Sequence, residues 1–472
     1  IKSMEIVGMR YSLTSLSMLG RHVLLAKLSA SIIGAIGLLG LLWSGTPAMA
    51  IPAFARQTGQ SCVACHAGGQ FPELTPYGRM FKLTGYTMGE RGNPLALMGV
   101  VDVTKTRNNS DGLGGNLSPE DGHVIADFAS IFAGGKINEN VGGFAQWTYA
   151  VHDRQASNGT WEGHLGSDNF DLRYADEAMR GTHSLVWGLV LNNNPTVQDV
   201  WNSSPAWGYP YISTTTGAFG GPPVSTLIEG GLAQQVAGLG VYAYLDKSVY
   251  LEFSNYQTAK GFWSFLSLGN RTGNANHPLT YISGGSPYLR IAYTHDWGAQ
   301  NIMLGAFGLQ SRVVPLDANN FPIYGQGRTR YRDIGIDGQY QYLLDPHTIT
   351  AQVRYIHESI HDDTLTLYTG PASLKSFRAK VSYVYQARYG ASLALTDLRG
   401  SADSTAYAAS VNNQPNTRYW TQEIFWMPKE NLRIGLQYNY FRKYLGASTN
   451  YDGNERNASN NNTAYLYMWF AL

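Results

Sequence analysis

From residue 95 onward, apolar and polar residues alternate with a period of two along most of the chain. The alternating stretches are rich in Tyr, Val, Leu and Phe and are interrupted by Gly, Asn, Asp and Pro, a pattern typical of β-strands separated by turns. It predicts sixteen strands, at residues 95–107, 121–134, 140–151, 170–178, 183–192, 236–245, 247–257, 288–297, 300–309, 331–343, 346–358, 375–388, 390–399, 418–428, 431–443 and 463–472.

The connections between these strands alternate strictly between short and long. Eight are long and polar, the largest at about residues 193–235. The seven tight ones lie around Asn138-Glu139, Arg180-Gly181, Asp246, Gly298-Ala299, Asp345, Tyr389-Gly390 and Pro428-Lys429. An up-and-down antiparallel barrel in an outer membrane has this arrangement, because its tight turns face the periplasm and its long loops face outward.

Side chains within the strands divide into an apolar and a polar set. In residues 375–389 the apolar set is Phe377, Ala379, Val381, Tyr383, Tyr385, Ala387 and Tyr389, and the polar set is Arg378, Lys380, Ser382, Gln386 and Arg388. We expect the first set to face lipid and the second to face a wet lumen. The sequence therefore predicts an all-β fold, a 16-stranded antiparallel transmembrane β-barrel, with a soluble all-β protein as the alternative. The barrel must close, because lipid cannot satisfy an open sheet edge.

The first fifty residues have the pattern of a signal peptide. An apolar stretch at residues 28–43 follows Arg21 and Lys27, and Ala48-Met49-Ala50 supplies small residues for cleavage. A membrane-anchoring helix is the alternative, although the stretch is shorter than the roughly 18–20 residues that span a bilayer. After residue 50 no apolar run approaches that length.

Three regions follow: a signal peptide at 1–50, a small domain at 51–94 and a porin-like outer-membrane β-barrel at 95–472. An even number of strands places both ends of the barrel on the periplasmic side, so residues 51–94 should lie inside the barrel or beneath it.

Composition excludes several other classes of protein. The chain has 472 residues, 44% of them hydrophobic and 14% charged, which excludes intrinsic disorder, and its two cysteines exclude a disulfide scaffold. The 34 basic residues almost cancel the 33 acidic ones. This balance leaves no excess of positive charge to attract nucleic acid, so no nucleic-acid partner is expected.

One motif in the sequence carries chemistry. Cys62-Val63-Ala64-Cys65-His66 has the spacing of covalent c-type haem attachment, in which two thiols on one helical turn bond the vinyl groups and the next imidazole becomes an axial iron ligand. A disulfide within the turn and half of a zinc site are the alternatives. Structural zinc usually needs four ligands, and the chain has no second cysteine pair. We therefore predict one covalent haem c in a monohaem cytochrome c domain, residues 51–94, that plugs the barrel.

The sixth iron ligand is less clear from the sequence. Met80, Met88 and Met98 lie downstream at workable separations, and Met88 is favoured. A methionine would raise the reduction potential relative to a second histidine. His123, His152 and His164 are competitors that fit loop or lumen positions better. Arg56, Arg79 and Lys82 are candidate partners for the haem propionates, with charged surface as the alternative.

These residues resemble a known family, the fused monohaem cytochrome c and porin proteins that serve as outer-membrane iron oxidases in iron-oxidising bacteria. The resemblance rests on Phe54 to Gly59 (FARQTG), on Cys62 to His66, and on Pro72 to Arg79 (PELTPYGR) with Phe81-Lys82 and Gly85-Tyr86-Thr87. At the level of motifs it covers residues 54–87, and in architecture it covers the whole chain.

The resemblance implies an iron oxidoreductase. Electrons would pass by outer-sphere transfer from extracellular ferrous iron to the haem and then to a periplasmic cytochrome c, with no catalytic side chain beyond the haem. A hydrocarbon core of about 30 Å is too thick for direct exchange from the periplasmic mouth, so the haem should lie within the lumen. Glu73, Asp333 and Asp337 are candidates for attracting the cation, with porin-type charge pairs as the alternative.

Two other functions remain open at this point. The first is a porin for small anions, selected by the lumen arginines Arg354, Arg378 and Arg388, with the haem domain as a gate or sensor. The second is a haem oxidoreductase for a donor other than iron. In each case outer-membrane lipid surrounds the barrel, which is either a monomer or a homo-oligomer of the kind that porins form.

Overall fold

A computed structural model describes residues 52–69, 72–110, 115, 117–118, 120–155, 161–204, 223–269, 278–317 and 319–472, without the side chains of 152–161. The chain divides into two compact units, Ile1–Ala48 and Met49–Leu472. The first unit and the predicted signal peptide lie outside the described residues. Over the described ranges, every helix is too short or too polar to cross a membrane.

Sixteen antiparallel strands form a closed barrel in the second unit, as the sequence predicts. They are β1 Leu95–Thr106, β2 Val124–Lys136, β3 Val141–Gln155, β4 Trp161–Arg180, β5 His183–Asn192, β6 Val236–Leu245, β7 Val249–Thr258, β8 Ser286–Trp297, β9 Gln300–Val313, β10 Thr329–Leu344, β11 His347–Asp362, β12 Ala372–Tyr385, β13 Tyr389–Gly400, β14 Thr417–Lys429, β15 Leu432–Lys443 and β16 Thr463–Ala471. Each strand pairs with its neighbours in sequence, and β1 closes the ring against β16 with Met98 opposite Ala471.

The two faces of the barrel wall differ as lipid and lumen require. In β7, Tyr250, Glu252 and Ser254 are buried inside the barrel, whereas Leu251 and Phe253 are 41% and 46% exposed on its outer surface. Exposed apolar side chains recur on the outside of the other strands, including Leu289, Ile291 and Ile336. An apolar outer face on a closed sheet is the arrangement that a bilayer stabilises.

Most predicted strands agree with the structure to within a few residues, and two regions differ. Strand β4 begins at Trp161, nine residues before the predicted start at 170, because pairs such as Glu162 with Arg154 extend its ladder with β3. The turn placed at Tyr389-Gly390 lies instead at Gln386 and Ala387, which both adopt a φ of 52°, and Tyr389 opens β13.

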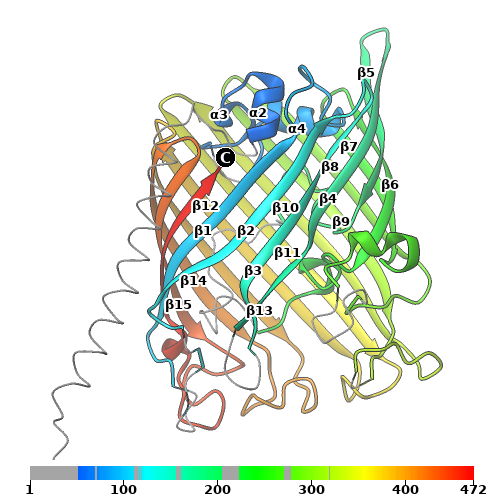
Figure 1. Cartoon of the computed structure of the whole chain (residues 1–472). Helices are drawn as coiled ribbons and strands as arrows, with labels where there is room; N and C mark the ends of the chain where they lie inside the picture. Colours follow the sequence, from blue (N-terminus) through cyan, green and yellow to red (C-terminus); the bar gives the residue numbers. More distant parts are fainter. Residues whose placement is uncertain are drawn as a thin grey trace, which may run out of the picture. The chain divides into compact units, whose positions relative to one another are not determined.

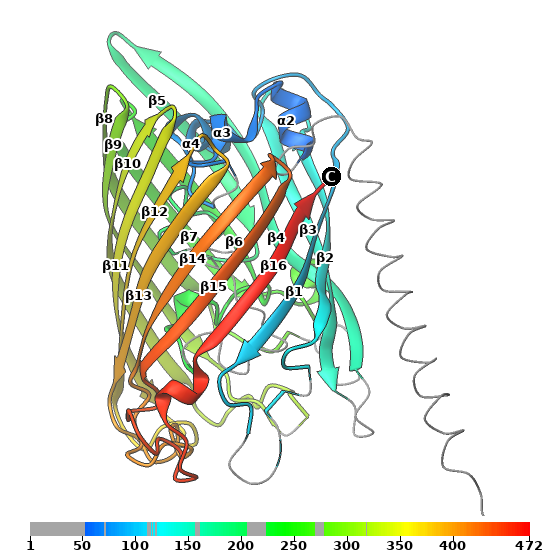
Figure 2. The ribbon, with the colours of Figure 1, turned by 90° about the vertical axis from the view of Figure 1, so that its left-hand side faces the viewer.

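Three α-helices precede the barrel: α2 Pro52–Thr58, α3 Cys62–Cys65 and α4 Pro76–Leu83. Three short 3-10 helices lie in the long connections: η1 Leu227–Glu229, η2 Gly261–Leu266 and η3 Ala458–Asn461. Figures 1 and 2 show α2, α3 and α4 at the end of the barrel where the tight turns and the C-terminus lie, while the long loops gather at the other end. The helical segment thus occupies the mouth that the sequence assigns to the periplasm.

Residues 193–204, in the connection after β5, lie in the lumen next to these helices. Val197, Val200 and Trp201, in the connection after β5, are completely buried. The Asn202 side chain donates to the Pro72 carbonyl, and Gln352 of β11 donates to the Trp201 carbonyl at 3.0 Å. The first part of the longest predicted loop, 193–235, therefore folds inward and joins the helical segment to the barrel wall.

Candidate functional site

Helix α3, which carries the two cysteines of the haem-type motif, packs against α4 with almost no space between the two backbones. Pro76 opens α4, and the Thr75 hydroxyl caps it by accepting the Gly78 N–H at 3.1 Å. A Cβ on Gly78 would lie 2.1 Å from the Cys65 carbonyl oxygen, so only glycine permits this approach. The Thr75 N–H also donates to that carbonyl at 2.9 Å. These contacts fix α3 relative to α4.

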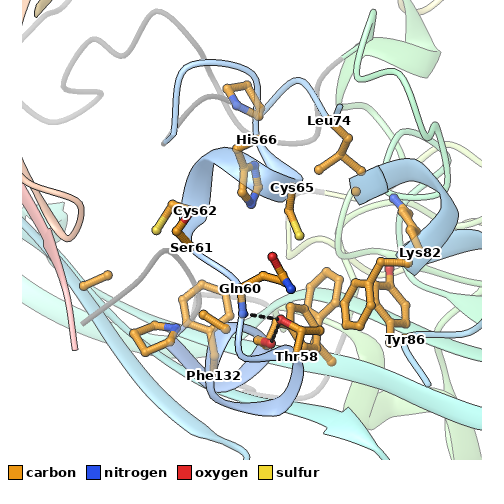
Figure 3. A pocket seen from close by; sticks show the side chains of 18 of the residues that line it. Thr58, Gln60, Ser61, Cys62, Cys65, His66, Leu74, Lys82, Tyr86 and Phe132 are labelled. Carbon is orange, nitrogen blue, oxygen red and sulfur yellow. Dashed lines mark hydrogen bonds between the residues drawn. The ribbon is translucent and has the colours of Figure 1, made fainter. Parts of the chain in front are cut away.

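Cys62, Cys65 and His66 line one cavity at the barrel mouth. The cavity has about 1180 Å³ of empty space, including the part open to solvent. Figure 3 shows the Cys65 sulfur and the His66 ring pointing into this space from α3, with Phe132, Tyr86 and Lys82 across it. Aromatic side chains from both the helical segment and the barrel form much of the wall: Phe54, Phe81, Phe132, Phe144 and Trp469.

This arrangement fits the haem c that the motif predicts. Cys62, Cys65 and His66 all line this space, and its walls are largely apolar, as a cofactor pocket requires. Burial raises the pKa of the Cys65 thiol to about 11, so this thiol is protonated at neutral pH. Cys62, Cys65 and His66 are the residues that would hold the group.

The barrel holds the helical segment through hydrogen bonds at several points. The Cys62 N–H donates to the Glu430 carboxylate in the turn between β14 and β15, at 3.1 Å. The Tyr86 hydroxyl donates to Asp171 of β4 at 2.6 Å, and the Tyr242 hydroxyl of β6 donates to the Leu83 carbonyl at 2.7 Å. The segment is therefore docked on three separate parts of the wall.

The three predicted propionate partners occupy different places. Arg79 is buried and donates to Gln341 of β10 at 3.1 Å and to Asn301 of β9 at 3.2 Å, so its guanidinium anchors α4 to the wall. Arg56 donates to the carbonyls of Asn93 and Leu95 in the linker to β1. Lys82 alone of the three lines the cavity.

Lys82 carries a buried amine beside that cavity. Its Nζ donates to the Val197 carbonyl and lies 3.9 Å from a carboxylate oxygen of Asp171. Burial lowers the pKa of Lys82 to about 8, and the Asp171 charge opposes this effect. The amine is therefore only partly charged near pH 8, and a further anion in the cavity would favour its protonated form.

The candidate sixth ligands differ in whether they line the cavity. Met98 of β1 lines the cavity. Met88, which the sequence favours, packs on the cluster that contains Phe81 and Phe144 but does not itself line the cavity, and Met80 packs on Leu83 and the wall. His123 is 3.5 Å from Glu120, and His164 contacts the Leu268 carbonyl at 3.0 Å, both away from the cavity. The side chain of His152 lies outside the described residues.

The acidic residues proposed to attract a cation all have partners. Lys380 of β12 forms an ion pair with Glu73, which is 1% exposed. Arg290 donates to Asp337 at 2.6 Å, and Asp333 accepts the Ile228 N–H at 2.8 Å. These contacts are of the porin charge-pair and loop-anchoring type. Across the ranges that the structure describes, no group of three or more His, Cys, Asp or Glu is placed to hold a metal ion.

The predicted lumen arginines differ among themselves in position. Arg354 of β11 faces the lumen and pairs with Glu229 of η1. Arg378 of β12 lies near it, lining the same small pocket. Arg388 is wrongly assigned to the lumen, because it lies exposed in the turn between β12 and β13, where the strand alternation has already ended.

Sequence reasoning missed the contribution of the barrel wall to the cavity. Phe132, Phe144 and Trp469 come from β2, β3 and β16, and Asn202 comes from the inward-folded loop. The sequence alternation indicates that these three aromatic residues face the inside of the barrel. It does not indicate at which height along the barrel axis the helical segment contacts the wall, so it could not assign them to the cavity.

Comparisons with known proteins give distant structural likenesses. No protein-family model and no curated protein matches the sequence. Among solved structures, the loop L8 deletion mutant of OmpT, an outer membrane protein of Vibrio cholerae, is 10% identical with a TM-score of 0.42, over 80% of this chain and 98% of that one. The outer membrane channel DcaP of Acinetobacter baumannii is 13% identical with a TM-score of 0.43, over 80% and 96%. OmpF of Salmonella typhi, in complex with daunomycin, is 13% identical with a TM-score of 0.41, over 80% and 97%.

Proposed function

We propose that this chain is an outer-membrane electron-transfer protein that carries one covalent haem c, takes electrons from extracellular ferrous iron and delivers them to a periplasmic cytochrome c. The observation that carries the proposal is the cavity at the barrel mouth, where Cys62, Cys65 and His66 line a common, largely apolar space. The choice of iron as donor rests on the resemblance of residues 54–87 to the iron-oxidising cytochrome–porin family.

Residues of this chain would attach the haem and determine the polarity around it. Cys62 and Cys65 would hold the group by thioether bonds, and His66 would bind its iron. The bound haem supplies a reversible one-electron change at iron. The aromatic wall excludes water and lowers the local polarity, and Lys82 offers a cation to a propionate.

The position of the cavity supports electron transfer to an acceptor on the periplasmic side. The helices that line the cavity lie at the mouth with the tight turns and not deep in the lumen, where the sequence places the haem. This end faces the periplasm in barrels of this kind, so ferrous iron would have to enter the lumen from the end with the long loops to reach the haem. Val63, within the motif, is 39% exposed, so the protein surface there is accessible to a soluble acceptor. The apolar outer face of the strands agrees with a lipid environment around the barrel.

The anion-porin alternative has less support. Arg354, its central candidate, is paired with Glu229, and residues 193–204 occupy the lumen next to the helical segment. A free cationic constriction would be needed to select anions. The described residues favour a plugged barrel over an open anion channel.

Anaerobic mixing of the purified, oxidised protein with ferrous iron tests the proposal. We expect haem colour to stay with the chain on a denaturing gel, and sharp reduced bands to appear on mixing at acid or neutral pH. The C62S/C65S double variant serves as the control and should lack the covalent colour. A colourless wild-type protein would overturn the haem assignment. A coloured protein that ferrous iron leaves oxidised at both pH values would overturn iron as the donor, and bilayer conductance would then favour the porin.

A further inference from the structure

A methionine of the barrel, and not of the helical segment, reaches the cavity that contains the haem motif. Met98 lies in β1, where Ala96, Val100 and Asp102 are buried with the same alternation, so its side chain faces the inside of the barrel. It lines the same cavity as Cys62, Cys65 and His66.

Met98 also connects two apolar clusters. One includes Phe81, Phe132 and Phe144 around the helical segment, and the other includes Trp469 and Ala471 of β16. Its backbone partner across the closing pair of strands is Ala471, whose small side chain also lines the cavity. The thioether is therefore positioned by the junction of the first and last strands.

Few other side chains at the cavity have an atom suited to bind iron. Apart from His66, the described lining residues include Lys82 and Tyr86, and both of these are engaged elsewhere. The Lys82 amine donates to the Val197 carbonyl, and the Tyr86 hydroxyl donates to Asp171 at 2.6 Å. Breaking either contact would leave a buried polar group without its partner, which is costly.

The other two methionines considered from the sequence do not line this space. Met88 packs on the same Phe81 cluster as Met98, and its carbonyl accepts the Gln57 side-chain N–H at 2.8 Å. Met80 packs on Leu83 and the wall of β5 to β9. Neither lines the cavity, although both are closer than Met98 to His66 in sequence.

We propose that Met98 is the sixth iron ligand, so that the barrel wall completes the coordination of a haem held covalently by the helical segment. This inference rests on the proposed haem c and does not depend on the identity of the electron donor. A thioether ligand raises the reduction potential relative to bis-histidine ligation. The potential would then depend on the packing of β1 against β16, since their pairing places the sulfur.

The test is an absorption spectrum of the full-length oxidised protein with Met98→Leu, beside matched M88L and M80L controls. Leucine has nearly the same volume as methionine, so the barrel should fold in all three variants. We expect the weak long-wavelength band of a thioether bonded to ferric iron in the wild type, M88L and M80L, and its loss in M98L. The reduction potential should fall in M98L, and M98H should give a bis-histidine spectrum with a lower potential still.

Several outcomes would overturn the inference. They are a thioether band that survives in M98L, a band lost in M88L or M80L, or a coloured wild type that lacks the band. K82Q addresses the remaining competitor, because a spectrum that changes in K82Q and not in M98L would assign the ligand to the amine. Covalent haem content is measured in every variant, so a colourless protein counts against the proposed function and a coloured one tests Met98 alone.

Discussion

The backbone N–H of Cys62 donates to the side-chain carboxylate of Glu430 across 3.1 Å, although 368 residues separate them in sequence. The haem-type motif is thus fixed to the tight turn between β14 and β15 as well as to its own helix. This contact joins the covalent attachment point of the proposed haem to the β14–β15 hairpin.

Glu430→Ala should loosen α3 from the barrel. Hydrogen bonds to a charged group contribute about 1.5–3 kcal/mol, and the half-exposed position places this one toward the lower end. We expect faster hydrogen exchange in residues 59–66, measured by mass spectrometry, with unchanged exchange in the strands. Glu430→Gln keeps an acceptor and should show a smaller effect. Equal exchange in wild type and E430A would mean that the contact does not hold the motif.

Gly78→Ala should separate α3 from α4. The added Cβ would lie 2.1 Å from the Cys65 carbonyl oxygen and 2.9 Å from the Cys65 carbonyl carbon, and backbone atoms cannot move aside as a flexible side chain can. Overpacking of this kind costs about 1–3 kcal/mol. We expect a lower thermal midpoint for the helical segment and less covalently attached haem per chain.

Gly92→Ala is the matched control, because its added Cβ would meet its nearest neighbour at 3.8 Å. This variant should retain the wild-type haem content. If G78A and G92A behave alike, the close approach of α4 to α3 is not needed for haem attachment.

Lys82 should make stability depend on pH in the alkaline range. Its pKa is lowered from 10.5 in the unfolded chain to about 8 in the folded one, mainly by burial. Between these values the unfolded state binds more protons, so stability rises with pH from about 8 to 10.5 and is independent of this group below 8. The full change is on the order of 3 kcal/mol.

The measurement is the unfolding midpoint in detergent at pH 7.5, 9 and 10.5, compared between wild type and Lys82→Met. Other groups titrate in both proteins, so the difference between the two slopes reports Lys82. We expect a steeper rise in the wild type. Parallel slopes would contradict a lowered pKa for this amine.

Much of the barrel could be predicted from the sequence because its strands obey a simple physical rule. Alternation along β6 and β5 predicts both of their boundaries, 236–245 and 183–192, since one face meets lipid and the other the lumen. The start of β4 could not be predicted, because Trp161 to Asn169 is rich in glycine and polar residues and becomes a strand only through its pairing with β3.

For the site, the sequence shows the attachment motif but does not show which residues surround it. The spacing of Cys62, Cys65 and His66 is local and is readable without a fold. Which methionine approaches the motif depends on how deep the helical segment sits in the barrel, and sequence distance favours Met88 over Met98. The same limitation applies to Arg79, whose charge suggests a propionate partner and whose structural role is to anchor α4.

The pairing of β1 with β16 has a consequence for how the protein matures. Met98 and Trp469, from the earliest and latest strands to be synthesised, face the same cavity, so its walls are complete only when the cylinder has closed. An attachment enzyme working on the exported chain would therefore find both thiols most accessible before closure. For the proposed haem c, attachment to the helical segment should therefore come first, and enclosure by the β15–β16 hairpin should follow.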